Sequence, residues 1–217
     1  MYNSILSSVL TSKLAYYNKN NAIIRLSPNK TKIIENIYTN SHIYINQCEN
    51  NNIIAFRGTH DIYDLINLAK ISKKKYSFRE DAFEMHSGIY NMFESIENEL
   101  TEYIVNDIKG SITFCGYSLG GCLASFASAY YASLFNNNIK ITCHTFGSPR
   151  IGNKEYVKWH EKRVHNSLHF VNDHDILTFF PQCKGYYNFK KIILPNDKIN
   201  PFVAHDLNTY IEEIKKL

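Results

Sequence analysis

A glycine-rich turn lies between an apolar run and a helix-forming run, with the sequence Gly116-Tyr117-Ser118-Leu119-Gly120-Gly121. The apolar run, Ile112-Thr113-Phe114-Cys115, is rich in residues that favour β-strands. The pattern G-x-S-x-G between a strand and a helix is typical of a nucleophile elbow, a sharp turn that leaves a serine oxygen exposed at the edge of a sheet. Gly116 and Gly120 lack the Cβ that would collide where strand and helix approach, and the serine must tolerate strained dihedrals. A chance match is the alternative, but the strand and helix contexts favour the elbow.

Hydrophobic periodicity along the rest of the chain predicts strands that alternate with helices. The expected helices cover residues 4–18, 88–105, 119–134, 153–163 and 206–215. The expected strands cover residues 31–38, 42–47, 53–56, 112–115, 139–146 and 168–172, with a hairpin strand at 189–194. Such alternation predicts an α/β fold, with a mostly parallel central sheet flanked by helices and active groups beyond the carboxyl ends of its strands.

The composition fits one globular domain over residues 1–217, because 44% of the residues are hydrophobic and 14% are aromatic. A net charge of +4 does not by itself indicate nucleic-acid binding, and it is compatible with approach to an anionic lipid surface. No apolar run is long enough to span a bilayer, so a membrane role would be peripheral.

The N-terminal residues and the cysteines bear on the compartment. Residues 1–17 lack both a basic start and a continuous apolar block, so we expect no signal peptide and a cytoplasmic location. Reduced structural thiols are favoured over one or two disulfides, because the number of cysteines is odd and no C-x-x-C pair occurs. The cysteines are Cys48, Cys115, Cys122, Cys143 and Cys183.

A serine nucleophile needs a base to take its proton and an acid to orient that base. In a strand-turn-helix elbow of this kind, the expected order along the chain is Ser, then Asp or Glu, then His. The strand at 168–172 delivers two candidate acids, Asp173 and Asp175, to the active edge of the sheet. His205, which opens the final helix, is the candidate base because it follows both acids.

The other histidines fit the base less well. His144 and His169 lie inside expected strands, where a buried core histidine is the favoured interpretation. His160 and His165 precede the acid, which is the wrong order.

An oxyanion that forms at the serine also needs hydrogen-bond donors. The helix after Ser118 offers the backbone N–H of Leu119 at its positive end. A second donor is expected from an earlier strand end, where Thr59 offers an N–H and a hydroxyl. Taken alone, Arg57-Gly58-Thr59 would be interpreted as an ordinary turn.

Five sequence blocks give the chain a resemblance to the class 3 lipases, the fungal triacylglycerol lipase-like branch of the α/β-hydrolases. The blocks are Ile54-Ala55-Phe56-Arg57-Gly58-Thr59, His86-Ser87-Gly88-Ile89-Tyr90, Gly116 to Ala124, Phe146 to Asn153, and Asp175-Ile176-Leu177 to Pro181. The resemblance implies that Ser118 is the nucleophile, Asp175 the acid and His205 the base. It implies an oxyanion hole made by Thr59 and Leu119. Asp175 is preferred over Asp173 because Asp-Ile-Leu followed by proline matches the acid block of the family.

The resemblance also implies a lid at about residues 60–85, with Ile62, Leu65 and Ile66 as a helical face that turns to lipid. An ordinary packed surface helix is the alternative. A run of basic residues would either recognise anionic lipid or be a solvated charge run. These residues are Lys70, Lys73, Lys74, Lys75 and Arg79. One departure lies beside the elbow, where Tyr117 replaces the usual histidine of the family and removes no catalytic proton carrier.

The sequence therefore predicts a serine carboxylic-ester hydrolase that acts on lipid esters, of the triacylglycerol lipase or phospholipase type, through an acyl-serine intermediate. We expect no cofactor and no metal, a lipid ester as the substrate, and peripheral contact with a membrane or lipid-droplet surface. The alternatives are an inactive lipid- or partner-binding module on the same fold, or an acyltransferase. A metal site of His169, Asp173, His174 and Asp175 is the weakest alternative, since neighbouring residues on a strand point to opposite faces.

Overall fold

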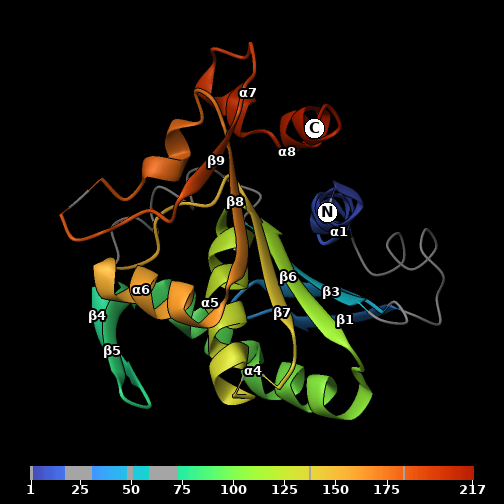
Figure 1. Ribbon diagram of the computed structural model, residues 1–217, viewed down its shortest axis with the longest axis vertical. Coiled ribbons are helices and arrows are strands. Elements are labelled where there is room, and N and C mark those ends of the chain that lie inside the picture. The colour runs from blue at the N-terminus through green and yellow to red at the C-terminus, as the bar shows by residue number, and fades with distance from the viewer. Residues whose placement is uncertain (1, 18–30, 48–50, 59–72, 137, 183) are drawn as a thin grey trace.

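The computed structural model describes residues 2–17, 31–47, 51–58, 73–136, 138–182 and 184–217. Within these ranges the centre is a seven-stranded sheet with the order β1-β2-β3-β6-β7-β8-β9 (Figure 1). Its strands are β1 (Thr31–Asn36), β2 (Ser41–Asn46), β3 (Asn51–Phe56), β6 (Ser111–Tyr117), β7 (Ile141–Phe146), β8 (Asn166–Asn172) and β9 (Lys191–Leu194). The pairs from β3 to β9 are parallel, whereas β1 and β2 are antiparallel additions at one edge. The predicted mostly parallel sheet is confirmed.

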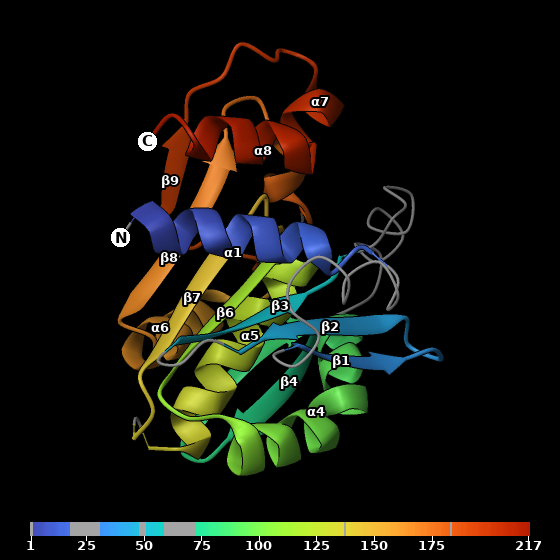
Figure 2. The same ribbon diagram turned by 90° about the vertical axis from the view of Figure 1, so that its right-hand side faces the viewer.

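Helices cover both faces of this sheet, as Figures 1 and 2 show from two sides. One face carries α1 (Tyr2–Leu14) and α8 (Leu207–Ile214), which pack beside each other. The opposite face carries α4 (Ser87–Asp107), α5 (Leu119–Leu134) and α6 (Lys154–Arg163). Each face buries its own hydrophobic cluster, so the sheet lies between two cores.

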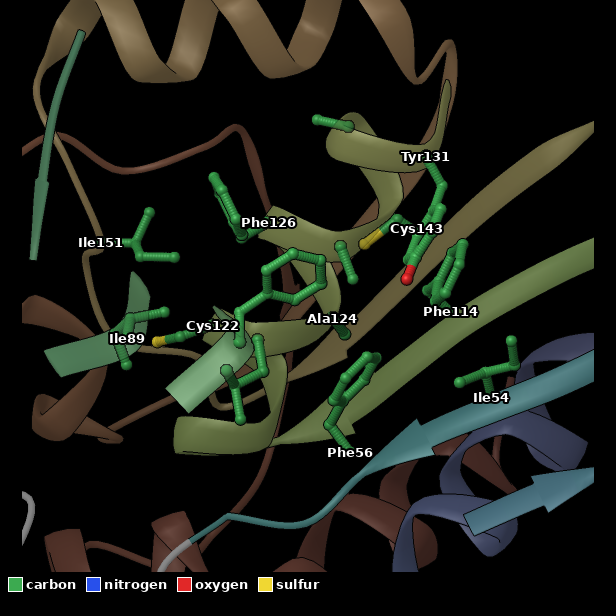
Figure 3. Packing of buried hydrophobic residues seen from close by; sticks show 14 of the residues in the cluster. Ile54, Phe56, Ile89, Phe114, Cys122, Ala124, Phe126, Tyr131, Cys143 and Ile151 are labelled. Atoms are coloured by element: carbon green, nitrogen blue, oxygen red, sulfur yellow. The ribbon is translucent and has the colours of Figure 1, made fainter. Parts of the chain in front are cut away.

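The larger core forms where α5 lies against β3 and β6 (Figure 3). Phe56 and Phe114 project from the two strands, and the Tyr131 ring of α5 stacks on Phe114 with centroids 5.6 Å apart and planes 5° apart. Both phenylalanines are fully buried. Burying one such side chain stabilises the fold by about 1.5–3 kcal/mol. This packing fixes the position of α5, and therefore of the residue that precedes it, Ser118.

The lid that the sequence suggested at about residues 60–85 falls only partly within the described residues. Residues 59–72, which include Ile62, Leu65 and Ile66, lie outside the described residues. The remainder is an antiparallel pair, β4 (Lys73–Phe78) and β5 (Asp81–His86). Tyr76, Phe78, Phe83 and Met85 alternate with polar residues along it, the period-two signal of a strand pair.

The end of the chain differs from the prediction in two ways. The strand predicted as a hairpin partner, β9, instead runs parallel to β8, because the chain crosses back to the amino end of the sheet between them. A short helix, α7 (Pro201–His205), was missed. The sequence does contain helix-start residues at this point. Asn200 caps α7 by accepting a hydrogen bond from Phe202 N–H, and Pro201 lies in the first turn of the helix.

The described cysteines agree with the expectation of reduced thiols. Cys115, Cys122 and Cys143 are free and buried. Burial raises the pKa of each thiol from 9.0 to about 12. These three are therefore neutral core side chains. Cys48 and Cys183 lie outside the described residues.

Candidate active site

Ser118 occupies a strained turn between β6 and α5. Its φ of 55° and ψ of −126° lie in a region that non-glycine residues rarely adopt. A Cβ at Gly116 would approach Gly120 O to 2.1 Å, and one at Gly120 would approach Phe56 O to 2.1 Å. Only glycine therefore permits this close contact of β6, α5 and β3. The elbow geometry predicted from the sequence is present.

Three predicted site residues from distant parts of the chain meet at this turn. His205 Nε2 lies 3.0 Å from Ser118 Oγ, and His205 Nδ1 lies 2.8 Å from Asp175 Oδ2. All three residues are at least 96% buried, with exposed fractions of 4%, 1% and 3% for Ser118, Asp175 and His205. An ionised carboxylate can only accept, so Nδ1 donates to Asp175 and the free electron pair of Nε2 faces the serine hydroxyl.

Asp175 follows the carboxyl end of β8 and is held by two further donors. Its Oδ1 accepts from the backbone N–H of Leu177 at 3.1 Å, at the start of η2 (Ile176–Phe179). Its Oδ2 also accepts from the Tyr210 hydroxyl at 2.5 Å. Asp173, the other candidate acid, is exposed, and its Oδ1 accepts from His174 N–H. The geometry therefore places Asp175, and not Asp173, against His205.

Tyr210 is a site residue that sequence reasoning missed. Its hydroxyl donates to Asp175 and also accepts from the backbone N–H of Asn172 at 3.0 Å. The contact joins α8 to the end of β8. Burial raises the pKa of the Tyr210 phenol, so the hydroxyl keeps its proton. No local sequence motif predicts the contact between Tyr210 and Asp175, because this contact depends on how α8 packs against the sheet.

The two predicted oxyanion donors differ in what the structure describes. Leu119 is the first residue of α5, where the backbone N–H has no intrahelical acceptor. Thr59 lies outside the described residues. The residue before it, Gly58, follows β3 and donates its N–H to the Tyr16 hydroxyl at 3.0 Å. The chain therefore reaches position 58 at the same sheet edge as Ser118.

The two histidines expected inside strands, His144 and His169, are buried core side chains. His144 Nδ1 lies 2.9 Å from Ser8 Oγ, and both residues are buried. His169 lies between Thr145 Oγ1 and Ser167 Oγ, each 2.8 Å from a ring nitrogen. Among the described residues, no group of three or more His, Cys, Asp or Glu side chains is arranged to hold a metal ion. His169, Asp173, His174 and Asp175 therefore do not form such a group.

The basic run does not form one patch in its described part. Lys73 makes an ion pair with Glu84 at 3.2 Å, whereas Arg79, near the other end of β4, hydrogen-bonds Asn136 at 2.5 Å. Lys74 and Lys75 are exposed between them. Lys70 lies outside the described residues.

Comparison with known families places this fold and site in context. The family model for class 3 lipases matches residues 53–185, which include the end of β3, the elbow and Asp175. This chain belongs to the class 3 lipase family.

Curated relatives of this chain are longer proteins. It is 30% identical over 97 residues to the chloroplastic phospholipase A(1) DAD1 of Arabidopsis thaliana. That alignment covers 44% of this chain and 22% of the relative. It is 36% identical over 159 residues to the chloroplastic phospholipase A1-Igamma1 of the same plant. That alignment covers 59% of this chain and 31% of the relative. The chain thus spans less than a third of either relative.

Solved structures confirm the α/β-hydrolase fold of this chain. The triacylglyceride lipase of Rhizomucor miehei matches with a TM-score of 0.73 at 17% identity, covering 88% of this chain and 79% of that one. A triacylglycerol lipase of Penicillium expansum matches with a TM-score of 0.72 at 15% identity, covering 89% and 79%. In the part of the chain that the structure describes, no helix has the length and apolar character needed to cross a membrane.

Proposed function

We propose that this protein hydrolyses carboxylic esters of lipids through an acyl-serine intermediate. One observation carries the proposal: His205 connects Ser118 and Asp175 by contacts of 3.0 and 2.8 Å in a buried site. Membership of the class 3 lipase family supports it, as do relatives named as phospholipases A1 and triacylglycerol lipases.

In the first half of the proposed reaction, Ser118 Oγ bonds to the acyl carbon while its proton passes to His205 Nε2. Negative charge develops on the former carbonyl oxygen. The Leu119 N–H at the start of α5 would stabilise this negative charge by a hydrogen bond, with Thr59 proposed as the second donor. His205 then protonates the leaving alcohol as the bond between the acyl carbon and the alcohol oxygen breaks.

In the second half, His205 takes a proton from water while the water oxygen bonds to the acyl carbon. The bond between the acyl carbon and Ser118 Oγ then breaks, His205 Nε2 returns the proton to Oγ, and the carboxylic acid leaves. Asp175 stabilises the positively charged imidazole in both halves, because its Oδ2 faces Nδ1 at 2.8 Å. Tyr210 and Leu177 N–H keep this carboxylate oriented.

Exposed apolar side chains around the site support a lipid substrate and peripheral contact with a lipid surface. One group lies on η2 and α7, beside Asp175 and His205. It comprises Ile176, Phe179, Phe202 and Val203, which are 42–58% exposed. Soluble proteins rarely gather large exposed apolar side chains without a binding role.

A second exposed apolar pair lies at the same sheet edge, in the turn between β1 and β2. Ile37 is 80% exposed and Tyr38 is 93% exposed. Arg57, just after β3, donates to the carbonyl of Asn40 in this turn at 3.3 Å. The turn therefore lies at the carboxyl end of β3, on the edge that carries Ser118. We define the apolar edge as Ile37, Tyr38, Ile176, Phe179, Phe202 and Val203, and propose that it contacts lipid.

Turnover of defined esters tests the proposed activity. We expect wild-type protein to hydrolyse p-nitrophenyl esters and at least one of triolein, phosphatidylcholine and lysophosphatidylcholine. The same panel distinguishes the lipase type from the phospholipase type. An inactive binding module would bind vesicles without releasing fatty acid, and an acyltransferase would release product only with an added alcohol acceptor. We also propose that residues 1–217 form a single domain, and the lid at residues 60–85 stays a prediction.

A further inference from the structure

Tyr117, the residue before the candidate nucleophile, contacts the backbone of the candidate base. Its hydroxyl donates to the carbonyl oxygen of His205, a residue 88 positions further along the chain. Its ring also lies against the His205 imidazole, with centroids 5.1 Å apart and an angle of 39° between the planes. One side chain therefore touches both the main chain and the ring of His205.

The backbone at His205 needs such support from outside its own helix. His205 ends α7, which has only five residues, and Asp206 directly afterwards caps α8. A helix this short has little stability of its own, so tertiary contacts must fix its last residue. Asn172 provides one contact, because its side-chain amide donates to the carbonyl of Ala204 at 2.8 Å.

The Tyr117 ring is itself held by packing. It lies between Tyr16 and Tyr210, with both centroids 6.1 Å from its own. Because Tyr117 ends β6, its backbone position follows the central sheet. Burial raises the pKa of the Tyr117 phenol far above its ordinary value of 10.0, and the nearby Tyr16 adds to this rise. The raised pKa favours the protonated hydroxyl, which is the form that donates to His205.

We propose that Tyr117 is a positioning residue that holds the His205 main chain, so that Nε2 stays within hydrogen-bond distance of Ser118 Oγ. The inference rests on the proposed hydrolase function. Tyr117 at the end of β6 would then position the base, and the next residue, Ser118, would be the nucleophile. A shift of about 1 Å at a catalytic group can reduce the rate about 100-fold, so this link matters for turnover.

The Tyr117→Phe variant tests the proposal, because it removes the donor and keeps the ring. On a short-chain p-nitrophenyl ester, we expect kcat to fall about 10- to 100-fold while KM changes less than about twofold. The rate of labelling by a fluorophosphonate probe should fall by a similar factor. Incorporating 4-aminophenylalanine at position 117 restores a donor and should recover most of kcat.

Tyr131→Phe is the matched control for lost stability. This variant also removes a buried tyrosine hydroxyl, one that lies 3.0 Å from Thr101 Oγ1 in the core between α4 and α5. We expect it to lower the melting temperature and to leave kcat within about twofold of wild type. If Tyr117→Phe retains kcat within the same limit, or if both variants lose kcat in proportion to melting temperature, the positioning role is wrong. An inactive wild type would instead overturn the proposed function itself.

Discussion

His205 Nε2 lies 3.0 Å from Ser118 Oγ although 87 positions separate the two residues along the chain. Ser118 depends on the elbow between β6 and α5, whereas His205 depends on the short helix α7. The contact is therefore formed by tertiary packing and not by a local motif. Asp175 is the third residue of this hydrogen-bonded group, because its Oδ2 lies 2.8 Å from His205 Nδ1.

The acid assignment predicts different effects for two neighbouring carboxylates. Asp175→Asn removes the acceptor that holds the Nδ1–H tautomer of His205, so kcat should fall by about 10³- to 10⁴-fold. Asp173→Asn is the control, because Asp173 is exposed and its carboxylate accepts a hydrogen bond from the adjacent His174 N–H rather than from His205. It should stay within about threefold of wild type. Steady-state kinetics on a soluble ester measures both, and the reverse pattern would make Asp173 the acid.

Buried histidines predict a loss of stability in mild acid. Burial lowers the pKa of His144 from 6.5 to about 4 and that of His160 to about 3. The pKa of His169 is also lowered by burial, with nearby His160 and His144 as smaller causes. Below pH 6.5 the unfolded chain binds protons that the folded chain cannot bind, so the free energy of unfolding falls as the pH falls.

Urea unfolding between pH 7.5 and pH 5 measures this effect. Each buried histidine adds at most about 1.4 kcal/mol per pH unit to the slope. A His144→Gln, His160→Gln double variant should have a shallower pH dependence than wild type. Equal slopes for the two proteins would show that these histidines do not cause the acid sensitivity.

If the apolar edge contacts lipid, substitutions in it should weaken vesicle binding and leave the turnover of a soluble ester unchanged. The Ile37→Ser, Tyr38→Ser variant should bind phosphatidylcholine vesicles at least about tenfold more weakly, because two large apolar side chains no longer leave water. Its turnover of a short-chain ester should match wild type. Val105→Ser is the control, since Val105 is 63% exposed near the end of α4, beside the amino end of the sheet. Sedimentation with vesicles measures binding, and equal losses in both variants would exclude a specific role for the turn.

Much of this fold follows from local sequence patterns. The elbow could be predicted because glycine is the only residue that fits at Gly116 and Gly120, and this requirement is visible in the sequence. The run Ile53 to Phe56 indicated a strand buried on both faces, and the structure has one there. The order of Ser118, Asp175 and His205 along the chain was likewise informative, because strand ends share one edge of a parallel sheet.

Other features depend on long-range packing and were not predictable in this way. The direction of β9 is set by the path between Asn172 and Lys191, which has no periodic pattern to interpret. Tyr117 was recognised only as a substitution beside the elbow, because its bond to His205 joins two segments that are remote in sequence. The contact of Tyr210 with Asp175 has the same cause.

Covalent labelling of Ser118 by a fluorophosphonate probe tests the proposed nucleophile most directly, with peptide mass spectrometry to locate the adduct. We predict a single adduct on Ser118 in folded wild-type protein, none in folded Ser118→Ala, and slower labelling of Asp175→Asn. Folded wild-type protein that remains unlabelled at Ser118, or that reacts equally well after Ser118→Ala, would contradict the assignment of Ser118 as an activated nucleophile.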